Sequence, residues 1–156
     1  MMILLGIFAG IVATLVFLFL FLRRKMFLES VSRYGFEETL SFLEKRAGEL
    51  KWGIPHQYDL QATLKSKGYE VKPVRIFSLC KPEVANLILA ADRERISSAL
   101  MPCRVSVYQR SDGKTYISRL NASLFSILLD HRVREAMRLA AAENEDIIAP
   151  LIMAKG

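Results

Sequence analysis

Two cysteines are the residues of this chain whose type and position best suit chemistry. Cys80 is followed by Lys81 and Pro82, and Cys103 is followed by Arg104. Each lies at a predicted strand end. Cys80 also directly precedes a predicted helix, whose dipole would lower the pKa of the thiol by stabilising the thiolate. If the two strands are neighbours, the thiols could exchange electrons, carry sulfur as a persulfide or bind a soft metal.

A structural role is the competing interpretation of both cysteines. A free Cys is among the most buried residue types and packs as a small hydrophobe. Cys103 is in register with Val105 and Val107, as a core side chain would be. Two cysteines are too few for a disulfide scaffold, and their separation rules out a Cys-x-x-Cys motif. Both interpretations therefore stay open.

Other polar residues are weaker candidates for a ligand site. His56 could join the two thiols as a third metal ligand, one short of a closed zinc site, or could simply be solvated. Asp59 follows in the same extended segment. Arg104, Arg119 and Asn121 could bind an anion or an acidic ligand, or could point outward from their strands. The sequence shows no triad order, phosphate-binding glycine loop or metalloprotease motif, so we predict no catalytic residue and name no metal or cofactor.

An uncharged apolar run at the N-terminus predicts a membrane anchor. Residues 2–22 are long enough to span a bilayer as a helix, which needs about 20 residues. A cleaved signal peptide would need a basic start and a small-residue cleavage site. Arg23, Arg24 and Lys25 follow the run and favour a cytoplasmic domain. We expect a single-pass protein of the cell inner membrane, with both thiols reduced.

Composition and charge describe one domain behind this anchor. The chain has 156 residues, a 52% apolar fraction that the N-terminal run inflates, and a net charge of +6. Outside residues 23–25 the basic residues alternate with acidic ones, which argues against a nucleic-acid partner. We predict an anchor with its basic flank in residues 1–25 and one soluble domain in residues 26–156.

Hydrophobic periodicity predicts an α+β fold with a mostly antiparallel sheet and helices on one face. Asp59 and Asn121 are predicted N-caps, and His131 lies on the apolar stripe of the last helix. Ser111–Lys114 predicts a hairpin turn. Residues 92–99 predict a loop, and residues 143–156 could dock or fray. The predicted strands are 27–33, 69–79, 103–109 and 115–120; the predicted helices are 36–51, 58–67, one starting near Pro82, and 121–142.

Four stretches together resemble the family catalogued as domain of unknown function 302 (DUF 302). They are Tyr58-Asp59-Leu60-Gln61, Leu79-Cys80-Lys81-Pro82, the run 97–104 that ends in Met-Pro-Cys-Arg, and the run 111–119 with Asn121. The resemblance covers roughly residues 35–129. Gln57-Tyr58 stands where an Ile-His pair is expected, so this chain departs from the pattern at that histidine.

The resemblance implies a two-layer sandwich similar to the TATA-binding-protein-like architecture, a tendency to form homo-oligomers, and no established reaction. Family members often look like companions of sulfur-metabolism or redox proteins. Two hypotheses follow. The first is a membrane-anchored module that binds a small ligand or a partner. The second is a thiol-based redox or sulfur-handling protein that uses Cys80 and Cys103.

Overall fold

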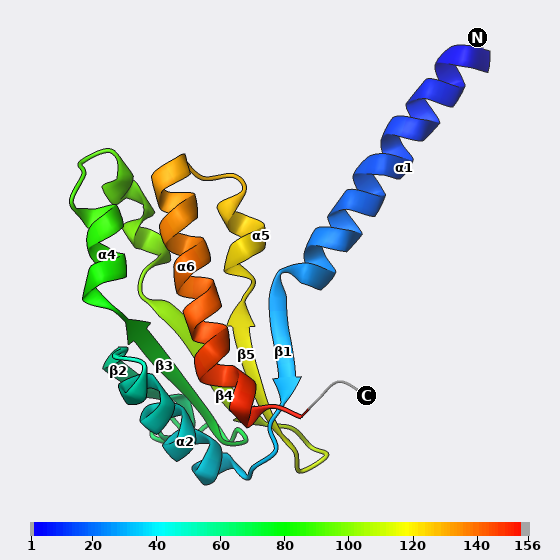
Figure 1. The fold of residues 1–156 in the computed structure, drawn as a ribbon. Helices are drawn as coiled ribbons and strands as arrows, with labels where there is room; N and C mark the ends of the chain where they lie inside the picture. The colour runs from blue at the N-terminus through cyan, green and yellow to red at the C-terminus, as the bar shows by residue number, and fades with distance from the viewer. Residues whose placement is uncertain (1, 154–156) are drawn as a thin grey trace.

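The computed structural model describes residues 2–153, beginning with a long apolar helix. Helix α1 (Met2–Lys25) stands clear of the rest of the chain, and its side chains from Gly6 onward are exposed (Figure 1). By length and composition it could cross a membrane, which is weak evidence for a span. Met26 alone separates it from the first strand.

A five-stranded sheet forms the centre of the domain. Its order is β1-β5-β4-β3-β2, and every neighbouring pair is antiparallel. Successive side chains of a strand point to opposite faces, so Phe77, Val107 and Ile117 share one face, and all three are fully buried. The strands are β1 (Phe27–Val31), β2 (Gly53–Asp59), β3 (Val74–Cys80), β4 (Cys103–Gln109) and β5 (Thr115–Leu120).

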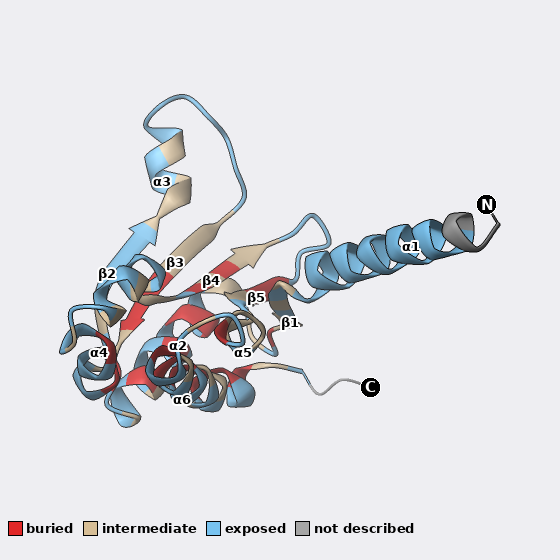
Figure 2. Ribbon diagram, turned by 90° about the horizontal axis from the view of Figure 1, so that it is seen from above, coloured by how far each residue is buried: buried red, intermediate tan, exposed pale blue. Residues whose placement is uncertain are grey.

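Helices cover that buried face, so the domain has two layers. Figure 2 shows α2, α4, α5 and α6 gathered on one side of the sheet with the buried residues between them, while α3 projects beyond the sheet on the side away from α1. The predicted α+β architecture is confirmed. The helices are α2 (Phe36–Glu49), α3 (Leu60–Lys65), α4 (Pro82–Leu89), α5 (Ala122–Ser126) and α6 (His131–Ile148), with 3-10 turns η1 (Glu94–Leu100) and η2 (Ala149–Leu151).

The predicted long helix 121–142 is wrong, because the chain forms two helices there. Asn121 caps α5 as predicted, accepting from the backbone N–H of Leu124. Arg134 then reaches back and donates to the carbonyls of Ser126, Ile127 and Leu129, which lie at and just after the end of α5. Helix α6 therefore starts afresh at His131, which is exposed rather than on an apolar stripe.

Three further segments differ from the prediction. Strand β2 was missed, and residues 94–100 form η1 rather than a loop. The strand predicted from residue 69 starts only at Val74. The C-terminal segment docks: Ile147, Ile148 and Leu151 are fully buried, and Ile152 bridges to Ser32. Residues 154–156 of the predicted tail lie outside the described part.

Candidate functional site

A cavity of about 630 Å³ opens at one end of the sandwich. It lies at the start of β4 and the end of β5, with η1, α5 and α6 on one side, and it also reaches Ile76, Ser106 and Ser118 on the other face of the sheet. Four of the residues singled out from the sequence line it together: Cys103, Arg104, Arg119 and Asn121. The antiparallel β4–β5 pairing, with Val105 opposite Arg119, brings the start of one strand beside the end of the other. A single register therefore assembles this part of the site.

Arg119 is held on the helix-facing side of the sheet. Its side chain is 9% exposed. It donates to both carboxylate oxygens of Glu145 on α6, with Nε at 2.7 Å from Oε1, and its Nη1 donates to Ser30 Oγ at 2.9 Å. The expected outward orientation is thus wrong for Arg119, although Arg104 is exposed. Because a bidentate pair neutralises its charge, Arg119 ties α6 to the sheet rather than offering a free cation.

Asn144 on α6 is the buried polar group that the cavity leaves unsatisfied. It is 7% exposed, and its Oδ1 has no hydrogen-bond partner. Its amide lies beside the thiol of Cys103 and lowers the pKa of that thiol. An unpaired buried acceptor costs about 1–3 kcal/mol, so a donor within the cavity would relieve it. Sequence reasoning missed Asn144, although a lone amide at helical spacing between Ala140 and Ile148 could have revealed it.

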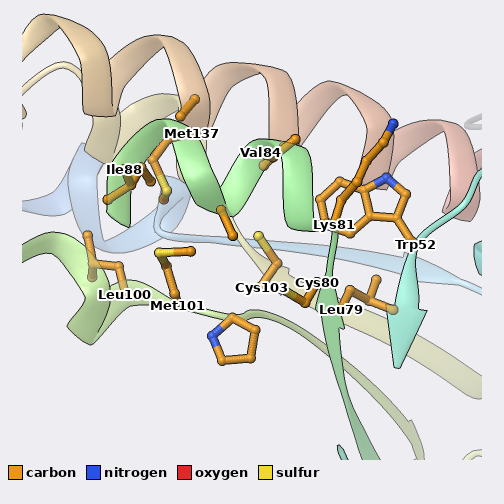
Figure 3. A pocket seen from close by; sticks show the side chains of 14 residues that line it. Trp52, Leu79, Cys80, Lys81, Val84, Ile88, Leu100, Met101, Cys103 and Met137 are labelled. Atoms are coloured by element: carbon orange, nitrogen blue, oxygen red, sulfur yellow. The ribbon is translucent and has the colours of Figure 1, made fainter. Parts of the chain in front are cut away.

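The two cysteines line a smaller, apolar cavity of about 30 Å³ beneath α4. Met101 and Met137 line it too, and Figure 3 shows their thioethers close to the Cys103 side chain. Both cysteines are free thiols on adjacent strands, since Leu79 pairs with Cys103. The two strands are thus neighbours, which is the condition that the thiol hypothesis set.

The electrostatics do not favour a thiolate at Cys103. Burial raises the pKa of the Cys103 thiol, and the amide of Asn144 opposes this only in part. Arg104 extends from the strand to the opposite face and is exposed. The charge of Lys81, the basic neighbour of Cys80, is already paired with Glu143 at 2.5 Å. Burial therefore dominates at Cys103, and neither basic residue offsets it.

A network of hydrogen bonds lies at the edge of the small cavity and was not predicted from the sequence. Trp52 Nε1 donates to Glu143 Oε2 at 2.8 Å, and Lys81 Nζ donates to the same oxygen. The Lys81 ammonium holds the pKa of Glu143 below its usual value; burial opposes this shift and the Trp52 indole assists it. The network joins the segments before β2 and α4 to α6.

His56 and Asp59 lie away from both cavities. His56 is exposed on β2, opposite Ser78 and beside the Tyr58 ring. Asp59 caps α3 by accepting from the Ala62 N–H and pairs with Arg75 at 2.5 Å. Across residues 2–153 no three His, Cys, Asp or Glu side chains are placed to hold a metal, so the structure does not form the Cys/Cys/His alternative.

These features define a small two-layer α+β domain, hollow at one end and carried on an apolar helix. Residues 28–152 match the family described as Domain of unknown function DUF302, and the chain belongs to this family. The match extends past both limits of the resemblance seen in the sequence, and α1 lies outside it.

The fold is similar to that of a solved structure. It is described as the crystal structure of uncharacterized conserved protein DUF302 from Bacillus stearothermophilus. The two chains are 20% identical with a TM-score of 0.72, over 81% of this chain and 98% of that one. At this identity the likeness shows the fold alone. No curated protein matches the chain.

Proposed function

We propose that this protein is a membrane-tethered domain that binds a small amphipathic ligand in the 630 Å³ cavity. Ligand pockets usually measure about 300–1,000 Å³ and carry a few polar groups in a mainly apolar lining. The observation that supports binding most directly is Asn144, whose buried Oδ1 lacks a partner at the cavity wall.

The lining suggests the chemistry of the ligand. Phe27, Leu100 and Leu120 give the rim an apolar character. Asn144 supplies an acceptor on α6, and the cation of Arg119 is already neutralised by Glu145. A ligand with an apolar body and a hydroxyl or amide N–H would match both parts, since each polar group must find a partner once it leaves water.

The tether is the second part of the proposal. Helix α1 would cross the membrane once, and its flank Arg23–Lys25 would remain on the cytoplasmic side of the cell inner membrane. Self-association and the finer likeness to the TATA-binding-protein architecture stay predictions. Light scattering of the detergent-extracted chain would measure the first.

Ligand capture tests the proposal. Native mass spectrometry of the detergent-extracted full chain should reveal a bound small molecule, and Asn144→Leu should weaken its binding roughly 5- to 150-fold, as the loss of about 1–3 kcal/mol predicts. Asn86→Leu, which removes an exposed amide on α4, is the matched control. Unchanged binding in Asn144→Leu, or a wild-type chain that captures nothing, would contradict the proposal.

Thiol chemistry is the second candidate, because Cys80 and Cys103 share one cavity. Alkylation of the folded chain across pH tests it. Since burial raises the pKa of Cys103, we expect its reaction to lag behind that of an ordinary thiol, whose pKa is about 8.5. Cys80→Ser and Cys103→Ser assign the reacting residue. Fast reaction at neutral pH would instead support redox or sulfur handling, with a sulfur-metabolism or redox protein as partner.

A further inference from the structure

We propose that one end of the domain docks on the same bilayer that holds α1, which places the mouth of the cavity at the lipid surface. The docking corner consists of Ile96 on η1 with Ile127 and Leu128 in the turn after α5. This inference rests on the proposed anchor and deepens the proposed function, because it says from where the ligand enters.

The docking corner exposes apolar side chains that the domain leaves uncovered. Leu128 is 85% exposed and Ile96 is 84% exposed, the two highest values among the large apolar residues of 26–153. Ile127 beside Leu128 is also exposed. They come from two separate elements, so a common surface that buries both must approach the same end of the domain. Apolar side chains at such a tip insert readily into the headgroup–acyl boundary.

Hydrogen bonds tie this corner to the end of the anchor. Asn121 Nδ2 donates to the Lys25 carbonyl at 3.0 Å, and the Asn121 N–H donates to the Met26 carbonyl at 2.9 Å. Helix α5 starts at the next residue and ends just before Ile127. At about 1.5 Å per residue, Leu128 lies roughly 10 Å along the chain direction from that tie.

The direction of α1 agrees with docking. Figure 1 shows α1 extending beyond the end of the domain at which the α4–η1 loop and the α5–α6 turn lie. Met26 is the only residue between α1 and β1, so the domain cannot swing far from the membrane surface. A bilayer around α1 therefore approaches the docking corner rather than the opposite end.

Charge around the corner suits anionic lipid headgroups. Basic residues near this end outnumber acidic ones by seven to four, and juxtamembrane Lys and Arg are attracted to the negative cytoplasmic leaflet. One of the acidic residues, Asp92, pairs with Arg95. The basic set is Arg23, Arg24, Lys25, Arg93, Arg95, Arg132 and Arg134; the acidic set is Asp92, Glu94, Asp130 and Glu135.

Docking would give the cavity a direct route to lipid. Phe27 and Leu120 line the cavity beside the anchor, and Leu100 lines it on the η1 side. With the docking corner in the headgroup region, this apolar rim would face the membrane. An amphipathic ligand could then move from the bilayer into the cavity without crossing water, which assigns the ligand to the membrane-soluble class.

Tryptophan quenching by brominated lipid tests the docking. The full chain is placed in vesicles of phosphatidylcholine and phosphatidylglycerol whose acyl chains carry bromine near the headgroup. The native Trp52 is the sole tryptophan and is buried, so it serves as an internal reference. The bromine should quench most of the fluorescence that the new tryptophan adds in Leu128→Trp. The same should hold, in a separate variant, for Ile96→Trp. Tyr69→Trp is the control, because Tyr69 is 64% exposed and lies in the loop after α3, on the side away from α1.

Vesicle flotation tests the membrane anchor separately from the docking of the corner. A chain that floats with the vesicles, with corner tryptophans quenched more strongly than Tyr69→Trp, supports docking. A chain that floats while all three variants are quenched equally overturns docking and leaves the anchor intact. A chain that fails to float removes the anchor and, with it, the docking inference. Because two corner positions are tested separately, the misfolding of one variant does not decide the result.

Discussion

The two ends of this sandwich are built from the same sheet and the same long helix, yet they differ in packing. At the closed end, Leu43 of α2 and Ile147 and Ile148 of α6 are fully buried. At the hollow end, Met137 and Ala141 of the same helix α6 line a 630 Å³ cavity. One end supplies the packing that stabilises the fold, and the other keeps space that a ligand could fill.

Truncation at the closed end should have the largest effect. Leu43→Ala removes a fully buried side chain and leaves a hole that dense packing cannot fill, so we expect a loss of about 2–5 kcal/mol in the free energy of unfolding. Denaturant unfolding of the detergent-solubilised chain measures it. A loss below about 1 kcal/mol would show that the closed end is not the stabilising half.

Replacing Asn144 should raise the free energy of unfolding rather than lower it. Asn144→Leu keeps the side-chain size and removes a buried acceptor that has no partner, so we expect the free energy of unfolding to rise by about 1 kcal/mol. The exposed Asn86→Leu should leave it unchanged. A destabilised Asn144→Leu would mean that its contact with Cys103 outweighs the orphaned oxygen. Asn144 would then favour both ligand binding and the stability of the fold.

Acid should weaken the network of Trp52, Lys81 and Glu143. Because Lys81 lowers the pKa of Glu143 in the folded state, the ionised carboxylate contributes stability above its unfolded pKa of about 4.3. That contribution is lost as the pH falls through the lower folded pKa. Glu143→Gln should therefore unfold with a weaker pH dependence below about pH 4.5. Equal pH slopes for the two chains in denaturant titrations would disprove the coupling.

Leu100→Ala should have the smallest effect on stability and gives the matched comparison for Leu43→Ala. Leu100 lines the cavity but is exposed, so we expect a change of about 0.5 kcal/mol or less in the free energy of unfolding. Its effect should appear in ligand affinity instead, measured by titration with whatever molecule the wild-type chain captures. A loss as large as that of Leu43→Ala would erase the distinction between the ends.

Local patterns in the sequence predicted local structure well. The bounds of β4 and β5 are as expected, because strict alternation and an Asp-Gly turn are properties of a few neighbouring residues. Asp59 and Asn121 cap helices as expected for the same reason. Strand β2 was not predicted as a strand because Pro55 and a bulge interrupt its alternation. An edge strand tolerates both features.

The remaining features depend on distant residues. Arg134 stabilises the break between α5 and α6. The sequence of α5 itself contains no pattern that predicts this break. Cys103, Arg104, Arg119 and Asn121 could be chosen as polar or reactive residues near two strands, but only the β4–β5 register brings them to one cavity. The sequence likewise could not reveal the cavity that leaves Asn144 without a partner.

The segment that follows β1 is paired with residues made 119 positions later, since Leu151 accepts from Ser32 and Ile152 accepts from Arg33. At about 5–20 residues per second, a ribosome needs roughly 6–24 s to cover that interval. For most of it, until residues 115–120 are made, β1 also lacks its neighbour β5. Helix α1 is finished and available to lipid long before the domain can close. If α1 is the proposed anchor, the chain reaches the membrane before its domain can fold.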